Sequence, residues 1–302
     1  MEIIVVDDGS VDSTPQIVAS YARSDARIRL FNRNHGGAPA TRNFAVSQAR
    51  GAFLAPCDSD DLWHPEKIAL QLAALCSAPA NVGVAYCWSV GIDEEDRVIL
   101  PDWARSTDEG DVLHAMMANS LPGSGSSPLI RRSCFDAAGG YPEDVPNADE
   151  WQLYIALAGI CGFALVRKHL VGYRFRRGQI SSNVAGMADS LARTTSWIVS
   201  KWPDTPGKVL RRRAYVVNCY LAFLSARQRR FLDACRYRVA AWSALPADLF
   251  SLSTLDFLLL MAGQGLRLER YYYCFWRRPV TWEPARKLRN DGHAAGADAS
   301  AP

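Results

Sequence analysis

The first hundred residues alternate strand-like apolar runs with amphipathic segments, and this alternation limits the fold more than any other feature of the chain. Continuous apolar runs are typical of parallel strands buried on both faces. The strand-like runs lie at residues 2–6, 27–31, 52–57 and 82–92, and helical patterns separate them at residues 13–25, 40–50 and 64–75. This order predicts an α/β fold in which helices cover both faces of a mainly parallel sheet.

Two of the predicted strands end in acidic clusters. Asp7 and Asp8 follow the first strand, and residues 58–61 follow the third. Ligands of open α/β sheets bind beyond the carboxyl ends of the strands, so we expect both clusters at one site. In an extended segment Asp58 and Asp60 point the same way, and their oxygens suit a hard cation such as Mg²⁺ or Mn²⁺. Such an ion would neutralise a diphosphate.

Neither acidic cluster is diagnostic by itself. A single Asp-x-Asp occurs often by chance, and an acidic turn after a strand is commonly a solvated loop or a helix cap. Receiver domains of response regulators also place paired aspartates at strand ends, but such a domain has about 100 to 150 residues. This chain has 302 residues. Its length, and the presence of both clusters on one α/β unit, argue against a receiver domain.

Charge and cysteine content narrow the class of protein further. From residue 201 onward the chain has 17 Lys and Arg against 8 Asp and Glu, although the net charge is only +3, so the N-terminal part is acidic. An acidic surface is unsuited to nucleic acid, and we expect no nucleic-acid partner. The eight cysteines form no Cys-x-x-Cys pair, which favours reduced thiols and a cytoplasmic location.

Three segments together resemble glycosyltransferase family 2, the inverting enzymes with a GT-A fold. They are EIIVVDDGSVDST, NHGGAPATRNFAVSQARGAFLAPCDSDDLWHPEKIALQ and GGYPEDVPNADEWQLYIALA. The resemblance covers residues 2–183 and implies a Rossmann-like domain that binds a nucleoside-diphosphate sugar, with UDP favoured. It also implies that the sugar passes to a hydroxyl of a saccharide or lipid-linked acceptor, in cell-surface polysaccharide synthesis.

The resemblance assigns roles to the residues that would bind the donor. Asp7 and Asp8 would hold the base and ribose of the nucleotide, with Asp8 favoured for the base. Arg42, within a Thr-Arg-Asn segment, would approach the nucleotide. Asp60 would ligate Mn²⁺ or Mg²⁺ directly, while Asp58 would lie nearer to the ribose and phosphate and serve as a second ligand. The resemblance therefore implies a metal-dependent enzyme.

An inverting transfer also needs one carboxylate that takes the proton from the acceptor hydroxyl. Family members commonly carry Glu-Asp before an aromatic residue here, whereas this chain carries Asp149 and Glu150 before Trp151. An ungapped alignment gives Glu150 the position of the base, and Asp149 is the second candidate. Both acids also begin a predicted helix, whose N-terminus is stabilised by negative charge. That structural role is compatible with catalysis.

Two further segments carry weaker predictions. The segment LPGSGSSP lacks the lysine of a P-loop, and we expect a loop on the acceptor side. In the closing segment YRFRRGQISSN, Arg177 is a candidate phosphate contact, although an exposed charge is the simpler interpretation.

The sequence divides into three parts. Residues 1–187 form the GT-A-like catalytic domain, and residues 188–285 form a small α-helical region that includes an antiparallel pair of helices. Residues 286–302 contain too few apolar side chains to fold, so we expect a disordered tail. The segment LERYYYCFWRRPVTW mixes aromatic residues with arginine, which suits core packing and also peripheral contact with the inner face of a membrane.

The beginning of the chain differs from the family pattern. Family 2 enzymes normally begin with an apolar strand, a Pro-x-Tyr-Asn type turn and a helix, before the strand that corresponds to residues 2–6. We therefore expect about 30 to 40 further residues upstream of Met1, the length of one strand–helix unit. The alternative is a truncated glycosyltransferase-like protein that binds its ligands with little or no turnover.

Overall fold

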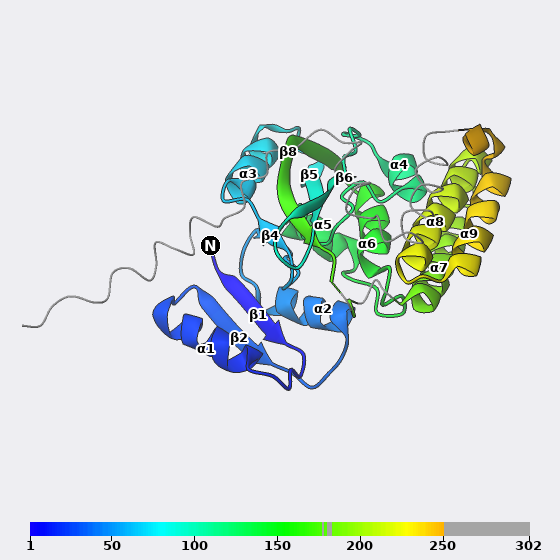
Figure 1. Ribbon diagram of the computed structural model, residues 1–302. Helices are drawn as coiled ribbons and strands as arrows, with labels where there is room; N and C mark the ends of the chain where they lie inside the picture. The colour runs from blue at the N-terminus through cyan, green and yellow to red at the C-terminus, as the bar shows by residue number, and fades with distance from the viewer. Residues whose placement is uncertain (177, 180–182, 251–302) are drawn as a thin grey trace, which may run out of the picture.

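The computed structural model describes residues 1–176, 178–179 and 183–250 (Figure 1). The predictions for Arg177, for the aromatic and basic segment 268–282 and for the tail 286–302 lie outside the described residues. The N-terminal elements follow the predicted alternation. They are β1 (Ile3–Asp7), α1 (Thr14–Ser24), β2 (Ile28–Asn32), α2 (Ala38–Gln48), β3 (Phe53–Leu54), β4 (Leu62–Trp63), α3 (Lys67–Ser77) and β5 (Val82–Ile92).

The second half of the described chain adds the remaining strands and most of the helices. These elements are β6 (Val98–Ala104), α4 (Leu113–Ala118), β7 (Leu129–Arg131), α5 (Arg132–Ala138), α6 (Asp149–Ala158), β8 (Gly162–Arg174), α7 (Val184–Lys201), α8 (Gly207–Arg227), α9 (Phe231–Ala244) and the 3-10 helix η2 (Pro246–Phe250). The predicted α/β class is therefore confirmed.

The strands form two sheets in the described part of the chain. β1 and β2 pair in parallel, and a six-stranded sheet has the order β3-β7-β5-β8-β4, with β6 on β5. The longest ladder of the second sheet, β5 with β8, is also parallel. The four shorter ladders are antiparallel, since β7, β4 and β6 run against their partners. The parallel pair of β1 and β2 matches the prediction, but the predicted strands at residues 52–57 and 82–92 belong to the second sheet and do not pair with them. The sequence pattern predicted neither β8 nor the antiparallel additions.

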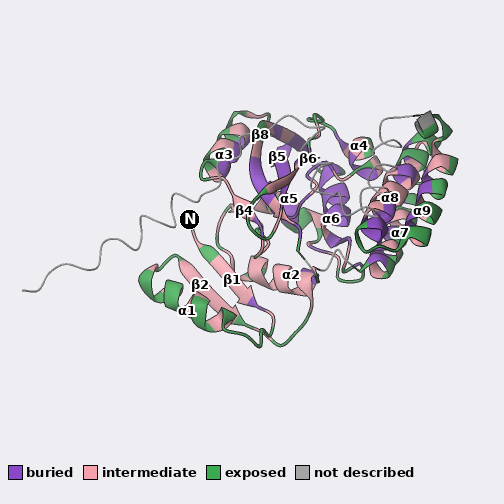
Figure 2. Cartoon of the chain, in the orientation of Figure 1, coloured by how far each residue is buried: buried purple, intermediate pink, exposed green. Residues whose placement is uncertain are grey.

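β5 is the centre of the core because both of its faces are covered (Figure 2). Side chains alternate between the two faces of a strand. Val84 and Tyr86 belong to the large apolar cluster that includes α6, whereas Ala85 packs with Leu75 of α3. The core therefore fixes α6, and with it the acidic residues at the start of that helix.

The C-terminal helices stack beside this core, as Figure 1 shows. The predicted antiparallel pair corresponds to α8 and α9. Arg213 of α8 is fully buried, lies 4.3 Å from the ring centroid of Trp151 in α6 and donates to the carbonyl of Met117. The helical region thereby packs directly on the helix that carries the predicted base. None of the helices described is both long enough and apolar enough to cross a membrane.

β1 is less buried than its apolar sequence predicts. Ile3 is 36% exposed, and Ile4, Val5 and Val6 are only partly covered. The cause is the pairing: among the described residues β1 bonds to β2 on one side, while its other side faces a cleft that Phe53 and the rest of β3 also line. The strand nevertheless brings Asp7 to its carboxyl end, as predicted.

Candidate active site

A cleft of about 2350 Å³ runs from β1 past the acidic loop after β3 to the N-terminus of α6. It brings together five residues that the sequence singled out, although they lie on different elements. Those residues are Arg42, Asp58, Asp60, Asp149 and Glu150. The cleft is therefore the candidate active site.

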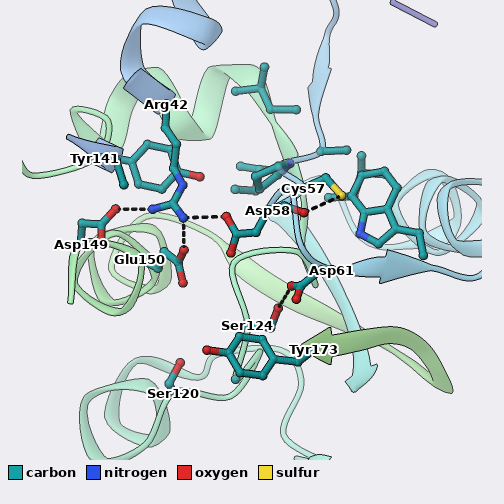
Figure 3. Close-up of a pocket in the computed structure, with 18 of the residues that line it drawn as sticks. Arg42, Cys57, Asp58, Asp61, Ser120, Ser124, Tyr141, Asp149, Glu150 and Tyr173 are labelled. Carbon is teal, nitrogen blue, oxygen red and sulfur yellow. Dashed lines mark hydrogen bonds and ion pairs between the residues drawn. The ribbon is translucent and has the colours of Figure 1, made fainter. Parts of the chain in front are cut away.

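One arginine organises three of the carboxylates (Figure 3). Arg42 extends from α2, its Nη2 lying 2.7 Å from Asp58 and 2.6 Å from Glu150. Its Nη1 lies 2.8 Å from Oδ2 of Asp149. A guanidinium has five N–H donors in one plane, and its two terminal nitrogen atoms reach different carboxylates at the same time. The three acids raise the pKa of Arg42 well above its ordinary value, against the opposing effect of burial.

The two acids at the start of α6 differ in exposure. The side chain of Asp149 is 6% exposed, while that of Glu150 is 26% exposed. Loss of water raises the pKa of both carboxyls, and for Glu150 it does so to about 8, with nearby Asp58 adding to the shift and Arg42 opposing it. Of the two, Glu150 is therefore the more accessible carboxyl and the one suited to exchange a proton near neutral pH.

The acidic loop after β3 is held by hydrogen bonds from other parts of the chain. The backbone N–H of Asp58 donates to Oγ of Ser126 at 2.9 Å. Asp60 pairs with Arg176 at 2.7 Å. Both carboxylates line the cleft, each with one arginine partner.

Asp61 is the buried acid of the same loop. One of its oxygens accepts the backbone N–H of Arg174 at 3.0 Å, and the other accepts the hydroxyl of Ser124 at 3.3 Å. Burial raises its pKa to about 7, with a smaller contribution from the negative charges of Asp58 and Asp60. Through Arg174 of β8 and through Ser124, Asp61 therefore holds the acidic loop in place.

Asp7 and Asp8 are placed differently from the other predicted site residues. Neither lines the cleft. Asp7 accepts the backbone N–H of Ser10, and the two oxygens of Asp8 accept those of Gly36 and Gly37 at 2.9 Å. These two hydrogen bonds lower the pKa of Asp8, although burial acts against them. In this structure the first acidic pair organises its own loops and is not brought into contact with the Arg42 cluster.

The segment LPGSGSSP, predicted as a loop on the acceptor side, packs against Glu150. A Cβ atom built on Gly125 would lie 2.3 Å from Oε1 of Glu150, closer than real contacts allow. Glycine is therefore required here by the approach of the carboxylate. Ser124 and Ser126 of this loop also form hydrogen bonds with the acidic loop after β3, at Asp61 and at the backbone of Asp58.

Asn43, next to Arg42, ties α2 to the loop before α6. Its side chain accepts the backbone N–H of Tyr141 and donates to the carbonyl of the same residue, both at 2.9 Å. Tyr141 in turn places its ring 5.5 Å from the guanidinium carbon of Arg42. The Thr-Arg-Asn segment therefore has two functions in the fold, one for each of its last two residues.

Motif reasoning on the sequence missed five of these residues. Ser126, Gly125 and Asn43 give no signal apart from their neighbours, because their roles depend on contacts across the fold. Asp61 stands in the quoted acidic motif, and only its burial distinguishes it from Asp58 and Asp60. The fifth, Arg176, was missed because the sequence singled out its neighbour Arg177 instead.

The residues suit a divalent cation by chemistry. Among the residues described, no group of three or more His, Cys, Asp and Glu side chains is arranged to hold a metal ion. Asp58 and Asp60 nevertheless supply the oxygen atoms that Mg²⁺ and Mn²⁺ prefer. Each is paired with an arginine, so a cation bound there would replace Arg42 or Arg176 as the positive partner.

Comparison with known proteins relates the chain to glycosyltransferases. Residues 1–137 match the sequence model of Glycosyl transferase family 2. EpsH of Bacillus subtilis is 29% identical over 141 residues, or 45% of this chain and 40% of EpsH. The succinoglycan biosynthesis protein ExoO of Rhizobium meliloti is 38% identical over 97 residues, or 31% of this chain and 26% of ExoO. The chain thus spans less than half of either relative.

A solved structure establishes the fold type. The mannosyltransferase PcManGT of Pyrobaculum calidifontis, determined with GDP-Man and Mn²⁺, superposes with a TM-score of 0.54 at 18% identity. The superposition covers 92% of this chain and 79% of PcManGT. The expected GT-A architecture is therefore confirmed.

Proposed function

We propose that this chain, a member of glycosyltransferase family 2, moves a sugar from a nucleoside-diphosphate sugar to an acceptor hydroxyl with inversion of the anomeric centre. The observation that carries the proposal is the cluster in which Arg42 meets Asp58, Asp149 and Glu150 in one cleft. Such a cluster combines a carboxyl of raised pKa with a fixed cation, and this pairing is typical of sites that transfer protons.

Glu150 is the proposed base and Asp149 the alternative. Glu150 takes the proton of the acceptor hydroxyl, and the oxygen attacks the anomeric carbon as the bond from that carbon to the diphosphate oxygen breaks. The electron pair of that bond leaves with the nucleoside diphosphate. A single displacement of this kind inverts the anomeric configuration. Asp149, buried against Arg42, is better placed to hold the guanidinium than to reach an acceptor.

Donor binding is assigned to Asp7, Asp8, Arg42 and Asp58, as the sequence predicts. Asp60 and Asp58 would hold Mn²⁺ or Mg²⁺, which when bound stabilises the negative charge of the departing diphosphate. PcManGT was solved with GDP-Man and Mn²⁺, which makes GDP-sugars worth testing beside the UDP-sugars that we favour. Arg42 and Arg176 would contribute positive charge at the same end of the cleft.

The acceptor is proposed to be a saccharide or a lipid-linked saccharide, used in cell-surface polysaccharide synthesis. ExoO is named for the biosynthesis of such a polymer. We propose a cytoplasmic location with peripheral contact at the inner face of the membrane. The second candidate function is binding of a nucleotide sugar without turnover, which the half-exposed β1 favours because strand coverage there is incomplete.

A panel of UDP- and GDP-sugars tests the proposal. The protein is incubated with each donor and with Mn²⁺, Mg²⁺ or a chelator, and release of nucleoside diphosphate is measured beside the thermal shift. We expect one donor to give metal-dependent release that Glu150→Gln lacks. A thermal shift without release would support the binding function, and neither response to any donor would refute both.

A further inference from the structure

Two cysteines on different elements face the same glycine. Cys134 lies on α5, and Cys161 lies in the turn between α6 and β8. A Cβ atom built on Gly83 would lie 2.3 Å from Sγ of Cys134 and 2.6 Å from Sγ of Cys161. Both sulfur atoms therefore occupy one small space beside the backbone of β5.

Gly83 creates this space by lacking a side chain. It stands at an irregularity in the parallel ladder, where the register shifts between Val82 and Val84. Even the methyl group of alanine would overlap both thiols at the distances given above. Both sulfur atoms lie within 2.6 Å of that one point, so they are less than about 5 Å apart, a separation that rotation of the two short side chains would have to close for a disulfide to form.

We propose that Cys134 and Cys161 form a reversible intramolecular disulfide, a modification site outside the cleft. Both residues are only half-buried, so a small disulfide can reach them, whereas Cys87 is buried. The cross-link would close the chain between α5 and the end of α6. The closed segment contains Asp149 and Glu150, so the redox state of the pair bears on the mobility of the proposed catalytic helix.

Oxidised glutathione is the oxidant that balances the reaction. One cysteine thiolate attacks the glutathione disulfide and releases one reduced glutathione, which leaves a mixed disulfide on the protein. The second cysteine then attacks the protein sulfur and releases a second reduced glutathione. The two thiol protons end on the two released molecules. Burial, together with the neighbouring Cys134, raises the pKa of Cys161 to about 12, so we expect the first attack from Cys134.

The sequence around the pair gives a direct test by mass spectrometry. No Lys or Arg lies between Ser133 and Arg167, so trypsin releases both cysteines in one peptide that contains none of the other cysteines. The whole protein is equilibrated at pH 8 with a large excess of oxidised over reduced glutathione, alkylated and digested without reductant. We expect peptide 133–167 to lack two hydrogens and to take up no alkylating group. Cleavage at its acidic residues should leave two fragments joined.

Thermal unfolding supplies a second measurement. A cross-link that closes a loop of this size stabilises the folded state, so the oxidised protein should melt several degrees above the reduced one. The difference should vanish in Cys134→Ser and persist in Cys235→Ser, which changes an exposed cysteine on α9. Two alkylated thiols or two glutathione adducts in peptide 133–167 of the wild-type protein would overturn the proposal.

Discussion

Nη2 of Arg42 lies 2.6 Å from Oε1 of Glu150. This contact joins α2 to the first turn of α6. A carboxylate held by a guanidinium keeps its orientation, and the positive charge limits how far burial raises its pKa. Arg42 therefore both orients the proposed base, Glu150, and keeps the pKa of its carboxyl lower than burial alone would make it.

Replacing Arg42 by lysine should show this double role. The one nitrogen atom of lysine cannot occupy both of the positions from which Nη1 and Nη2 bind the three carboxylates, so we expect kcat/KM to fall by about 10- to 100-fold while the fold persists. Steady-state release of nucleoside diphosphate and circular dichroism measure the two effects. Arg23→Lys, at the exposed end of α1, is the matched control. Activity equal to wild type would show that the cluster is not part of the reaction.

Glu150→Gln and Asp149→Asn distinguish the two candidate bases. Glutamine cannot accept the proton, so Glu150→Gln should retain donor binding and lower kcat by about 10²- to 10⁴-fold. Asp149→Asn keeps a side chain of equal size beside Arg42, and we expect a smaller loss. Donor binding measured by calorimetry, and kcat measured in the same buffer, distinguish the two candidates. The reverse order of losses would move the base to Asp149.

The pH dependence of turnover should follow Glu150. Since its pKa is raised to about 8, the carboxyl is mostly protonated at pH 6 and cannot take a proton. We expect kcat/KM to rise with pH and to reach half of its maximum near pH 8. In Arg42→Lys the midpoint should lie higher, because a weaker cationic partner stabilises the ionised form less. A profile that is flat from pH 6 to 9 contradicts this assignment.

Arg176 should compete with a divalent cation for Asp60. Removing the arginine in Arg176→Ala frees the carboxylate, so Mn²⁺ affinity without donor should rise about two- to fivefold, the worth of a partly exposed ion pair. Asp60→Asn should instead abolish Mn²⁺-dependent turnover and leave the circular dichroism spectrum unchanged. Titration calorimetry with Mn²⁺ tests the first expectation. Unaltered affinity in Arg176→Ala would place the cation away from Asp60.

Asp61 should make the stability of the protein depend on pH. Its pKa of about 7 in the folded state exceeds the ordinary value of 3.8, so the folded state binds a proton more tightly. This contribution to stability is complete below about pH 4 and is lost as the pH rises through 7. Asparagine does not ionise, so Asp61→Asn should avoid the cost of burying the charged carboxylate. We expect the variant to be more stable than wild type by about 1–3 kcal/mol at pH 8, with little difference at pH 4.5. Urea unfolding at both pH values, with Asp60→Asn as control, measures the difference.

The sequence pattern predicted much of the fold because long periodic segments carry strong signals. The strand at residues 82–92 has the predicted bounds, and α8 and α9 form the predicted pair. Two of the antiparallel strands, β4 and β7, were missed because they have only two and three residues, too few to show a period. The burial of β1 was overestimated, since an apolar run indicates what a strand could bury and not what the fold supplies to cover it.

The candidate site was predictable where one short motif carries the chemistry. Arg42, Asp58 and the acids at 149–150 converge as expected, from segments separated by about a hundred residues. Contacts that depend on backbone atoms left no trace in the sequence. Ser126 holds the backbone of Asp58, and Gly125 admits the carboxylate of Glu150, yet neither residue type is associated with the reaction.

Adjacent residues of α2 grip the site at two points. Arg42 forms ion pairs with the carboxylates. Asn43 forms two hydrogen bonds with the backbone of Tyr141, eight residues before Asp149. A rigid shift of α2 would therefore move the guanidinium of Arg42, the loop that contains Tyr141 and the start of α6 in the same direction. A nucleotide bound at the N-terminus of α2 would therefore affect the proposed catalytic base, Glu150, by moving the helix. It would do so without changing the charge around that carboxylate.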